Sequence, residues 1–497
     1  MDQFVSNMTI LFLLLPPIVG AGLVTALKKK RTIGIITICT ASLILIQVLF
    51  LVSRIVSEKT ITAFGDTFYV DSLSAVILLS VSVVGFVAAL YSKNYMGRQY
   101  DNGTIDDKHI VRYYQGFNVF LLTMLIVPTA NNLGIMWVMV EATTLVSVLL
   151  IMLYFKENAI EAAWKYLIIA TVGLSFALIG TVFFYYANIN TGTSEDAMNW
   201  TGMVHNAKLF DPNLVKIAFV FTLVGFGTKA GLAPMHTWLP DAHSEAPTPV
   251  SAVLSGVLLN CAFYAIIRFH IVSSVSIGPE FSNQLLIILA VVSIGIAAAS
   301  IYFQKDMKRM LAYSSVEHMG LISLGIGFGG LFGIYGAILQ VVNHAIAKPL
   351  MFFASGSVSQ KYEAKGMSRI KGIIKVMPVT GILFLIGGLA LVGMPPFNVF
   401  LSEFMILSSG FKSGQFIVTS LVLLFLVITF AVFLRHLFKM IFGNPISEMK
   451  KGEMGKLALI PMILLCSLVV IFGIYIPVQL QTLIQNTSTI ISGGGFA

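Results

Sequence analysis

Four ionisable residues of this chain lie inside long apolar segments, where a membrane helix normally carries none. They are Glu141, Lys229, Lys348 and Glu403. A charge at the centre of a membrane helix costs roughly 2.5–3.5 kcal/mol, so such residues face a protein interior or a wet cavity and usually mark an ion or proton pathway. The sequence therefore predicts a protein that moves protons, or another small cation, across a membrane.

Two of these residues form a possible relay pair. Glu141 occurs in the run WVMVEATTLVSVL and Lys229 in FTLVGFGTKAGLAP. If their helices pack together, the opposite charges favour both ionised forms while burial disfavours both, so the pair can change protonation state when one partner moves. Two structural alternatives stay open: a neutral carboxyl group that hydrogen-bonds between helices at Glu141, and a lysine that extends to the membrane interface at Lys229.

The second half of the chain offers a matching series. His344 and Lys348 are four residues apart in VVNHAIAKPLMFF, which places them on one face of a helix. The lysine disfavours the protonated form of the histidine, and this suits a proton carrier. Glu403, in MPPFNVFLSEFMIL, would end the series. The alternatives are a packing histidine at His344 and a water-exposed carboxylate at Glu403.

Further polar residues have weaker assignments. Glu317 and His318 in AYSSVEHMG would either extend the relay or serve in packing, and the segment PMHTWLPDAHSEAP combines histidines with acidic residues. The latter pattern resembles a metal site, but nothing in the sequence makes these ligands converge as zinc or a hard cation requires. A polar segment that holds a broken helix is the better interpretation, and it includes His236.

The sequence predicts no cofactor on this chain. Its three cysteines are Cys39, Cys261 and Cys466, each in a different apolar segment. An iron–sulfur cluster requires four thiolates at close spacing. Any redox centres that work with this protein are therefore expected on partner chains.

The elements that carry these residues are predicted to be membrane helices. The 497 residues are 57% hydrophobic and 11% charged, with a mean hydropathy of +0.90, whereas soluble domains carry about 25% charged residues. Apolar runs divide the chain into about fourteen spans. The expected fold is an all-α integral membrane protein, with one polytopic domain over residues 1–480 and a mobile tail over residues 481–497.

Loop charge predicts the orientation. Basic residues gather in alternate loops, including Lys28–Arg31, Lys305–Arg309 and Lys361–Lys375, while the other loops are poor in lysine and arginine. The positive-inside rule then places both termini, and the tail, outside a cytoplasmic membrane. The net charge of +9 is explained by these loops, and no basic patch with interleaved aromatic residues indicates nucleic-acid binding.

Two helices are predicted to be interrupted beside the buried charges. The interruptions are Lys229–Pro234 (KAGLAP) and Gly393–Pro396 (GMPP). Proline removes a backbone donor, and in a membrane the freed carbonyl groups are tolerated only against protein or internal water. Broken helices in corresponding halves of a transporter indicate the ion path and suggest inverted repeats.

The motifs KAGLAPMHTWLPDAHSEAPTPVSAVLSG, KRMLAYSSVEHMGL and GMPPFNVFLSEFMIL resemble those of a known family. It comprises the antiporter-like subunits of respiratory complex I, of multi-subunit Na+/H+ antiporters and of membrane-bound nickel–iron hydrogenases. The resemblance covers residues 71–439, and the words NNLGIMWVMVEATTL and LLNCAFYAIIRF make it most similar to the F-type subunit of hydrogenase-4 and formate hydrogenlyase complexes.

The resemblance implies fourteen helices with two inverted five-helix repeats, at about residues 115–270 and 285–440, and with broken seventh and twelfth helices. It implies proton-translocation roles for Glu141, Lys229, His344, Lys348 and Glu403, and a secondary role for Lys165, near the inner surface. One departure concerns Asn260, which stands where complex I relatives carry a lysine. An asparagine hydrogen-bonds water but cannot hold the proton's charge, and its presence favours the hydrogenase branch.

The expected function is thus proton translocation within a membrane-bound nickel–iron hydrogenase complex. The expected partners are the lipid bilayer, other membrane subunits and a hydrogenase peripheral arm that carries the iron–sulfur and nickel–iron centres. The alternatives are a subunit of a multi-subunit Na+/H+ antiporter and a subunit of a complex I type NADH–quinone oxidoreductase. The sequence does not distinguish H+ from Na+ as the coupling ion.

Overall fold

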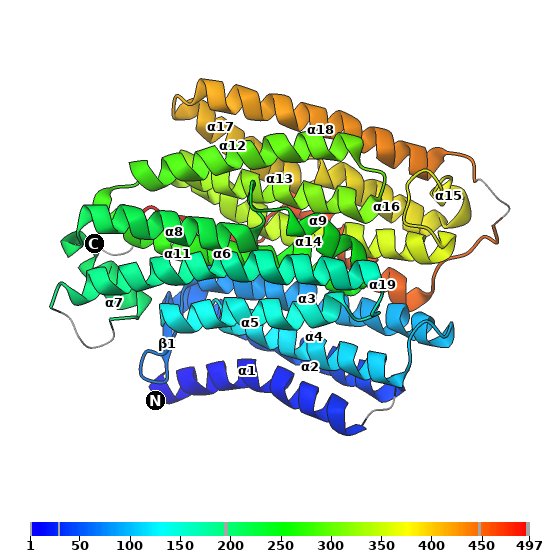
Figure 1. Ribbon diagram of the computed structural model, residues 1–497, viewed down its shortest axis with the longest axis horizontal. Helices are drawn as coiled ribbons and strands as arrows, with labels where there is room; N and C mark the ends of the chain where they lie inside the picture. Colours follow the sequence, from blue (N-terminus) through cyan, green and yellow to red (C-terminus); the bar gives the residue numbers. More distant parts are fainter. Residues whose placement is uncertain (1, 28–29, 193–196, 446–448, 494–497) are drawn as a thin grey trace.

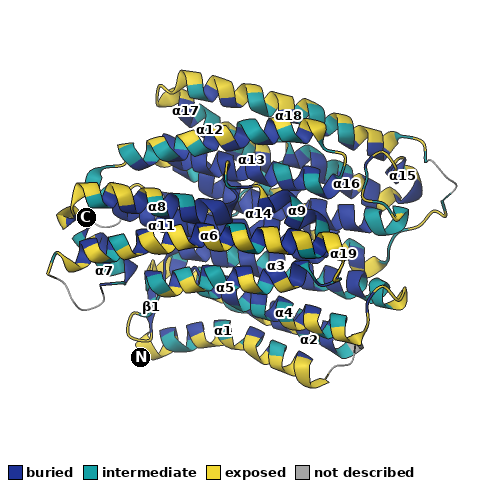
Figure 2. Ribbon diagram, viewed as in Figure 1, coloured by how far each residue is buried: buried dark blue, intermediate teal, exposed yellow. Residues whose placement is uncertain are grey.

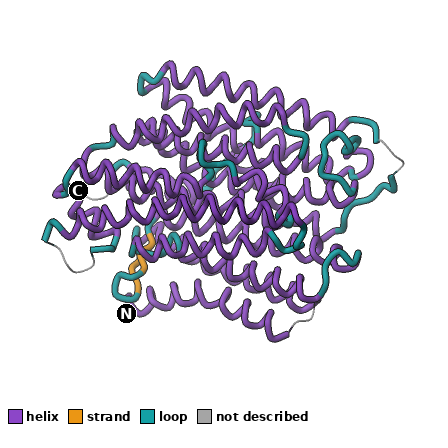
Figure 3. Tube along the Cα trace, viewed as in Figure 1, coloured by secondary structure: helices purple, strands orange, loops and turns teal. Residues whose placement is uncertain are grey.

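The computed structural model describes residues 2–27, 30–192, 197–445 and 449–493. It is a bundle of long, roughly aligned helices with almost no other regular structure in the described part (Figures 1 and 3). The helices of the first half are α1 (Asp2–Leu27), α2 (Lys30–Glu58), α3 (Ser72–Asp101), α4 (Asp107–Ile126), α5 (Leu133–Ile151), α6 (Glu157–Ile189), α7 (Trp200–Asn206), α8 (Pro212–Ala230), α9 (Trp238–Glu245), α10 (Thr248–Val253) and α11 (Leu259–Ile277), with a 3-10 turn η1 (Ala207–Leu209) and a π-helical turn η2 (Leu254–Leu258). Those of the second half are α12 (Glu280–Phe303), α13 (Met307–Phe328), α14 (Gly330–Tyr362), α15 (Ile373–Val376), α16 (Pro378–Leu391), α17 (Asn398–Lys412), α18 (Phe416–Phe442), α19 (Lys456–Ile474) and α20 (Val478–Ile491).

The helices confirm the predicted membrane fold. Eleven segments of the described chain are long and apolar enough to cross a membrane, and α4, α13 and the interrupted pair α16–α17 supply the remaining predicted spans. Burial separates inner from outer helices (Figure 2). The most apolar part of Thr248–Ile277 is 100% buried, whereas that of α18 is 22% buried and presents its apolar side chains outward. Such continuous exposed apolar surface is suited to lipid.

Both predicted interruptions are present. Helix α8 stops at Ala230, because Gly231 adopts the left-handed conformation (φ 77°) that favours glycine, and a short turn leads to α9. Helix α16 stops at Leu391, Gly393 is also left-handed (φ 68°), and α17 starts at Asn398. Each half of the chain therefore contains one broken helix, as expected. The inverted relation between the two halves stays a prediction.

Packing brings the broken helices to the centre. Helix α6 lies along α8, α11 packs on α8, and α14 packs on both α13 and α17. The helices that carry the candidate residues therefore pack against one another in a continuous series from α5 to α17. The polar side chains that these helices bring together, from Glu141 and Lys229 to Lys348 and Glu403, are called the row below. Helices α1, α2 and α18 flank this row (Figure 1).

Two features differ from the expectation. Residues Ile61–Ala63 and Phe68–Val70 form a small antiparallel sheet, β1–β2, with Thr62 opposite Tyr69. The C-terminal segment was expected to be a mobile tail from residue 481, but residues up to 491 belong to α20, which packs on α14 and α3. Its apolar residues Leu480, Leu483 and Ile484 recur at helical spacing and are buried. The polar residues between them make this pattern difficult to recognise in the sequence. Residues 494–497 lie outside the described residues.

The two ends of the bundle differ. Both termini and β1 lie at one end, and α15 with its loop lies at the other (Figure 1). The second end also carries the basic loops identified in the sequence, and it is called the basic end below.

Candidate functional site: a row of buried polar side chains

Lys229 lies at the point where α8 breaks and is completely buried. Its ammonium group donates a hydrogen bond of 2.7 Å to the Thr144 hydroxyl on α5 and another to the Tyr166 hydroxyl on α6. The ring of Tyr166 lies beside Trp238, with 4.4 Å between centroids, and the Trp238 indole donates to the Thr228 carbonyl. Neutral hydroxyl groups therefore hold the lysine, and α9 closes the site from the far side of the break.

Glu141 lies one turn before Thr144 on α5 and is only partly buried. Its carboxylate accepts a 3.0 Å hydrogen bond from Thr171 on α6, and its second oxygen has no hydrogen-bond partner among the described residues. The side chains of Glu141 and Lys229 both make their hydrogen bonds at the contact between α5 and α6. They do not form an ion pair in this conformation. The helix packing on which their pairing depended is present, and one turn of α5 separates their contacts.

Lys348 is the second buried lysine, near the midpoint of α14. Its ammonium group donates to the Leu311 carbonyl at 3.1 Å and to the Ser314 hydroxyl, both on α13. Lys229 and Lys348 thus share an environment of neutral oxygen acceptors, and in neither case does a described carboxylate lie within ion-pair distance.

Three helices meet around two histidines. His318 on α13 and His344 on α14 have ring centroids 5.4 Å apart. The Gln340 side chain forms a 2.6 Å hydrogen bond with His318 Nδ1, and the Ser402 hydroxyl donates to Gln340 Oε1 at 2.5 Å. Asn343 donates to Ser402 at 2.9 Å. This network joins α13, α14 and α17, and it contains polar residues that the sequence analysis did not select.

Glu403 lies on α17, next to Ser402, and is partly buried. Its carboxylate packs against the backbone of Gly393 at the break between α16 and α17, so closely that a Cβ atom at Gly393 would overlap Oε2. The interrupted helix therefore positions Glu403 beside the histidine network. Glu317, directly before His318, is also buried but makes no ion pair with Lys348.

Asn260 and His243 lie between α8, which carries Lys229, and α14, which carries Lys348. Asn260, on the buried part of α11, donates to the Gly256 carbonyl at 2.8 Å, while its side-chain oxygen has no partner in the described part. His243, on α9, stacks against Phe352 on α14 with 5.4 Å between centroids. Neither ring nitrogen of His243 has a described partner.

Several unpartnered buried polar atoms belong to residues of this row. They include both ring nitrogens of His344, one of His318 and both of His243, together with Asn260 Oδ1. Buried polar atoms in proteins are nearly always hydrogen-bonded, to ordered water where protein groups are absent. Bound water is therefore expected beside these atoms, and the imidazoles and lysines there are residue types that can carry protons.

The polar segment after the first break does not converge into a metal site. No group of three potential ligands is close enough among the described residues. His236 lies edge-on to Tyr313, with 6.0 Å between ring centroids, and Glu245 pairs with Lys365 at 3.0 Å. Asp241 pairs with Arg309, on α13.

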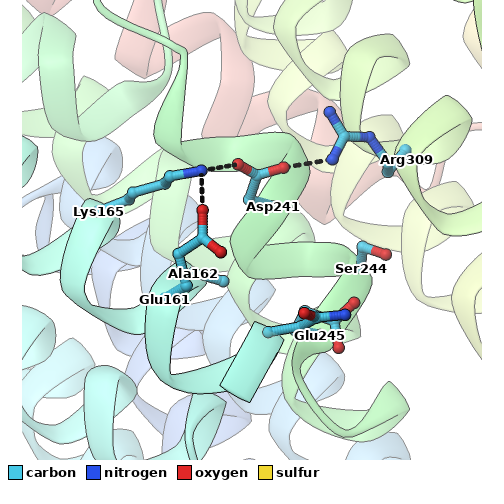
Figure 4. A pocket seen from close by; sticks show the side chains of 8 residues that line it. Glu161, Ala162, Lys165, Asp241, Ser244, Glu245 and Arg309 are labelled. Atoms are coloured by element: carbon cyan, nitrogen blue, oxygen red, sulfur yellow. Dashed lines mark hydrogen bonds and ion pairs between the residues drawn. The ribbon is translucent and has the colours of Figure 1, made fainter. Parts of the chain in front are cut away.

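Lys165 belongs to a separate, surface pocket at the basic end. It pairs with Glu161 at 2.6 Å and with Asp241 at 3.5 Å, and Asp241 in turn bridges to Arg309 (Figure 4). The pocket has a volume of about 230 Å³. Lys165 is 49% exposed, so the structure places it in this surface network rather than in the buried row.

A buried ion pair lies outside the row and was missed by the sequence analysis. The Arg268 guanidinium on α11 forms two hydrogen bonds, of 2.7 and 2.8 Å, with Asp71 at the start of α3. It also lies 4.1 Å from the Trp200 ring centroid. The signal was available, because Arg268 is a charge within an apolar run. Tyr166 and Gln340 gave no such signal, since uncharged polar residues are common in membrane helices.

Comparison with known proteins decides the family. The model described as "NADH:quinone oxidoreductase/Mrp antiporter, TM" matches residues 130–429, which include every residue of the row. A second, described as "NADH-Ubiquinone oxidoreductase (complex I), chain 5 N-terminus", matches residues 63–114. The chain belongs to the NADH:quinone oxidoreductase/Mrp antiporter family. It is a multi-pass, antiporter-like membrane subunit.

Relatives of this antiporter-like subunit occur in several kinds of complex. It is 37% identical to "Hydrogenase-4 component F homolog" of Methylacidiphilum infernorum, over 86% of this chain and 89% of the relative. It is 30% identical to an NADH-quinone oxidoreductase subunit of Desulforudis audaxviator, over 75% of this chain and 72% of the relative.

Solved structures include chains of the same fold. A chain of the membrane-bound sulfane sulfur reductase, an archaeal respiratory membrane complex, superposes with a TM-score of 0.87 at 27% identity, over 98% of both chains. A chain of the Mrp complex from Dietzia sp. DQ12-45-1b gives 0.85 at 18% identity, over 99% of this chain and 100% of that one, and this likeness shows the fold alone. Both of these similar chains come from larger complexes.

Proposed function

We propose that this chain is the proton-translocating subunit of a membrane-bound nickel–iron hydrogenase complex of the hydrogenase-4 or energy-converting type. The observation that carries the proposal is the row of buried titratable and unpartnered polar groups from Lys229 to Glu403, which crosses two broken helices. The 37% identity with a hydrogenase-4 component F homolog supports the choice of complex.

The geometry supports a stepwise transfer of protons along the row. Lys229 rests on hydroxyl groups, one turn from Glu141, so a small displacement exchanges neutral partners for a carboxylate. An opposite charge favours the protonated lysine and burial favours the neutral one, so each displacement changes the proton affinity of Lys229. His243, Asn260 and His344 then relay the charge to Lys348, and Glu403 accepts or releases the proton at the second break.

The energy for this movement would come from partner subunits. We place the nickel–iron and iron–sulfur centres on a peripheral hydrogenase arm and none on this chain. Redox chemistry there would displace Glu141 or Lys229 through neighbouring membrane subunits. We further propose a cytoplasmic membrane location with the basic end inside and both termini outside, following the charge of the loops.

A second candidate function is that of a component of an Mrp-type Na+/H+ antiporter. It is favoured by 30% identity with a component of the Na(+)/H(+) antiporter of Alkalihalophilus pseudofirmus, although the match spans only 54% of that relative. A role in a complex I type enzyme is a third possibility, given the NADH-quinone oxidoreductase relative. The copurifying subunits discriminate among them: a large nickel-binding subunit supports the hydrogenase assignment, and small antiporter subunits contradict it.

Replacement of Lys229 by alanine tests the transport role. We expect Lys229→Ala to abolish proton pumping by the complex in vesicles, while hydrogenase activity with soluble dyes stays nearly unchanged, because the redox centres lie on other chains. The matched control is Lys216→Ala, which removes a lysine of the same helix that lies over the ring of Phe281, outside the row. Pumping that survives in K229A would contradict the proposed function.

A further inference from the structure

A groove between α4 and α5 is not used by the transport row. It lies where α4 begins and α5 ends, at the basic end of the bundle, and has a volume of about 440 Å³. Nine of its ten lining residues are uncharged, and most are apolar: Gln115, Gly116, Val119, Val146, Leu149, Leu150, Met152, Leu153 and Phe155. The tenth is Arg112.

The groove opens towards the surrounding lipid. Leu149, on its wall, is 62% exposed, and Phe155, at its rim, is 50% exposed. Gly116 lets the two helices approach each other at its floor, because a Cβ atom there would meet Leu150 Cδ2 at 3.0 Å. The result is an apolar furrow between two helices, open on its outer side, of the shape that takes an extended hydrocarbon chain.

Arg112 provides the polar end. It is exposed on α4, and it makes no ion pair with any residue that the structure describes. Its guanidinium instead lies 5.9 Å from the centroid of the Phe155 ring. Arg268 and Arg309, by contrast, are each bound to an aspartate. Arg112 therefore keeps its hydrogen-bond donors available for an anion from outside the chain.

Phe155 adds an independent observation. Its backbone is left-handed (φ 48°), a conformation unfavourable for a residue with a side chain. Residues held in such conformations concentrate where a ligand is bound or a site is arranged. Here the strained turn brings the Phe155 ring to the rim of the groove, beside Arg112, and aromatic side chains are enriched where membrane proteins meet lipid headgroups.

We propose that this groove binds one anionic phospholipid from the leaflet at the basic end. Its phosphate would accept hydrogen bonds from the Arg112 guanidinium and the Gln115 amide, and one acyl chain would lie along Val119, Val146 and Leu149. Arginine binds phosphate oxygens through a planar, two-pronged contact, and basic pockets between membrane helices select anionic headgroups. The single unpaired cation of the lining is the reason for an anionic rather than a zwitterionic lipid.

Lipid retention by the purified complex tests this proposal. The complex is reconstituted with equal amounts of phosphatidylglycerol and phosphatidylcholine, re-extracted in mild detergent, and analysed by native mass spectrometry. We expect the wild type to retain phosphatidylglycerol preferentially, and Arg112→Gln to reduce that retention roughly tenfold, as for loss of one charge-assisted contact. The control is Lys412→Gln, which removes a cation that also lies over an aromatic ring, that of Phe332 at 4.6 Å, but outside the groove.

A second variant tests the hydrocarbon part. Val119→Trp fills the furrow and leaves Arg112 in place, so we expect it to displace the lipid as well. Equal retention of phosphatidylglycerol by the wild type and R112Q would overturn the proposal, as would equal retention of the two lipids by the wild type. Full retention by V119W would exclude the groove as the place of the acyl chain.

Discussion

Lys229 and Lys348, the two completely buried lysines, have the same kind of hydrogen-bond partners. Each ammonium group is held by hydroxyl and carbonyl oxygens, Lys229 by Thr144 and Tyr166 and Lys348 by Ser314 and Leu311. A lysine fixed by a carboxylate keeps its proton tightly, whereas neutral acceptors stabilise the charged form less. If the proposed function holds, the approach or departure of one charge should therefore change the protonation of either lysine.

Gln340 is the residue whose loss should reveal how far the histidine network is coupled. Gln340→Leu leaves both His318 Nδ1 and the Ser402 hydroxyl without their partner, and an unsatisfied buried group costs about 1–3 kcal/mol. We expect lower thermal stability and slower pumping, measured by unfolding in detergent and by vesicle acidification. Gln360→Leu, on the same helix but bound only to the Tyr95 carbonyl, should leave pumping intact. Unchanged pumping in Q340L would show that the histidine network is not part of the proton path.

Gly393 should be intolerant of a side chain for two separate reasons. Its φ of 68° disfavours any other residue by about 1–2 kcal/mol, and a Cβ atom would displace the carboxylate of Glu403. We expect Gly393→Ala to destabilise the protein and to lower pumping. Gly414→Ala isolates the backbone effect, since Gly414 has a φ of 77° and open space around it. Equal pumping by the two variants would show that the position of Glu403 is unimportant.

Residues whose charge is costly in a membrane were the most predictable part of the candidate site. Glu141, Lys229, Lys348 and Glu403 were selected on that ground, and the structure gathers them on helices of one row. The resemblance implied a position near the inner surface for Lys165, and the structure has this residue in a surface pocket. Tyr166 and Gln340 were not selected, since a hydroxyl or amide group carries no cost large enough to stand out.

At the scale of elements, the Arg268–Asp71 pair fixes α11 to the start of α3. Arg268→Ala leaves Asp71 buried and unpaired, which costs about 3–5 kcal/mol. We therefore expect a large drop in thermal stability, of which Arg268→Lys recovers only part because lysine lacks the two-pronged contact. Arg54→Ala is the control, since it removes a partly buried arginine that pairs with the exposed Glu58 four residues further on, and such helix pairs contribute about 0.5 kcal/mol or less. Similar losses in R268A and R54A would contradict this role.

The elements themselves were largely predictable, because membrane helices are long, apolar and separated by charged loops. Both helix breaks were also predictable from glycine and proline beside buried charges. The π-helical turn Leu254–Leu258 and helix α20 were not. A π turn depends on packing against neighbouring helices, and α20 is stabilised by the surfaces of α14 and α3 rather than by its own composition.

At the scale of the whole molecule, the orientation in the membrane is open to a direct test. We expect a cysteine introduced at Ser368, in the loop before α15, to be protected from a membrane-impermeant thiol reagent in intact cells. A cysteine at Thr489, on an exposed face of α20, should be labelled. The background for both is a chain without its three native cysteines, Cys39, Cys261 and Cys466. The reverse labelling pattern would invert the proposed topology.

The depth of the row has an electrical consequence. His318, His344 and Lys348 lie near the midpoints of α13 and α14, Asn260 lies near that of the α10–α11 span, and Lys229 and Glu403 adjoin the two breaks. A charge that crosses the whole bilayer exchanges about 2.3 kcal/mol per 100 mV with the membrane potential, but a charge that hops sideways at constant depth exchanges almost none. Voltage should therefore change the rates of proton entry and exit only, and transfer along the row should proceed at the same rate in an energised and a resting membrane.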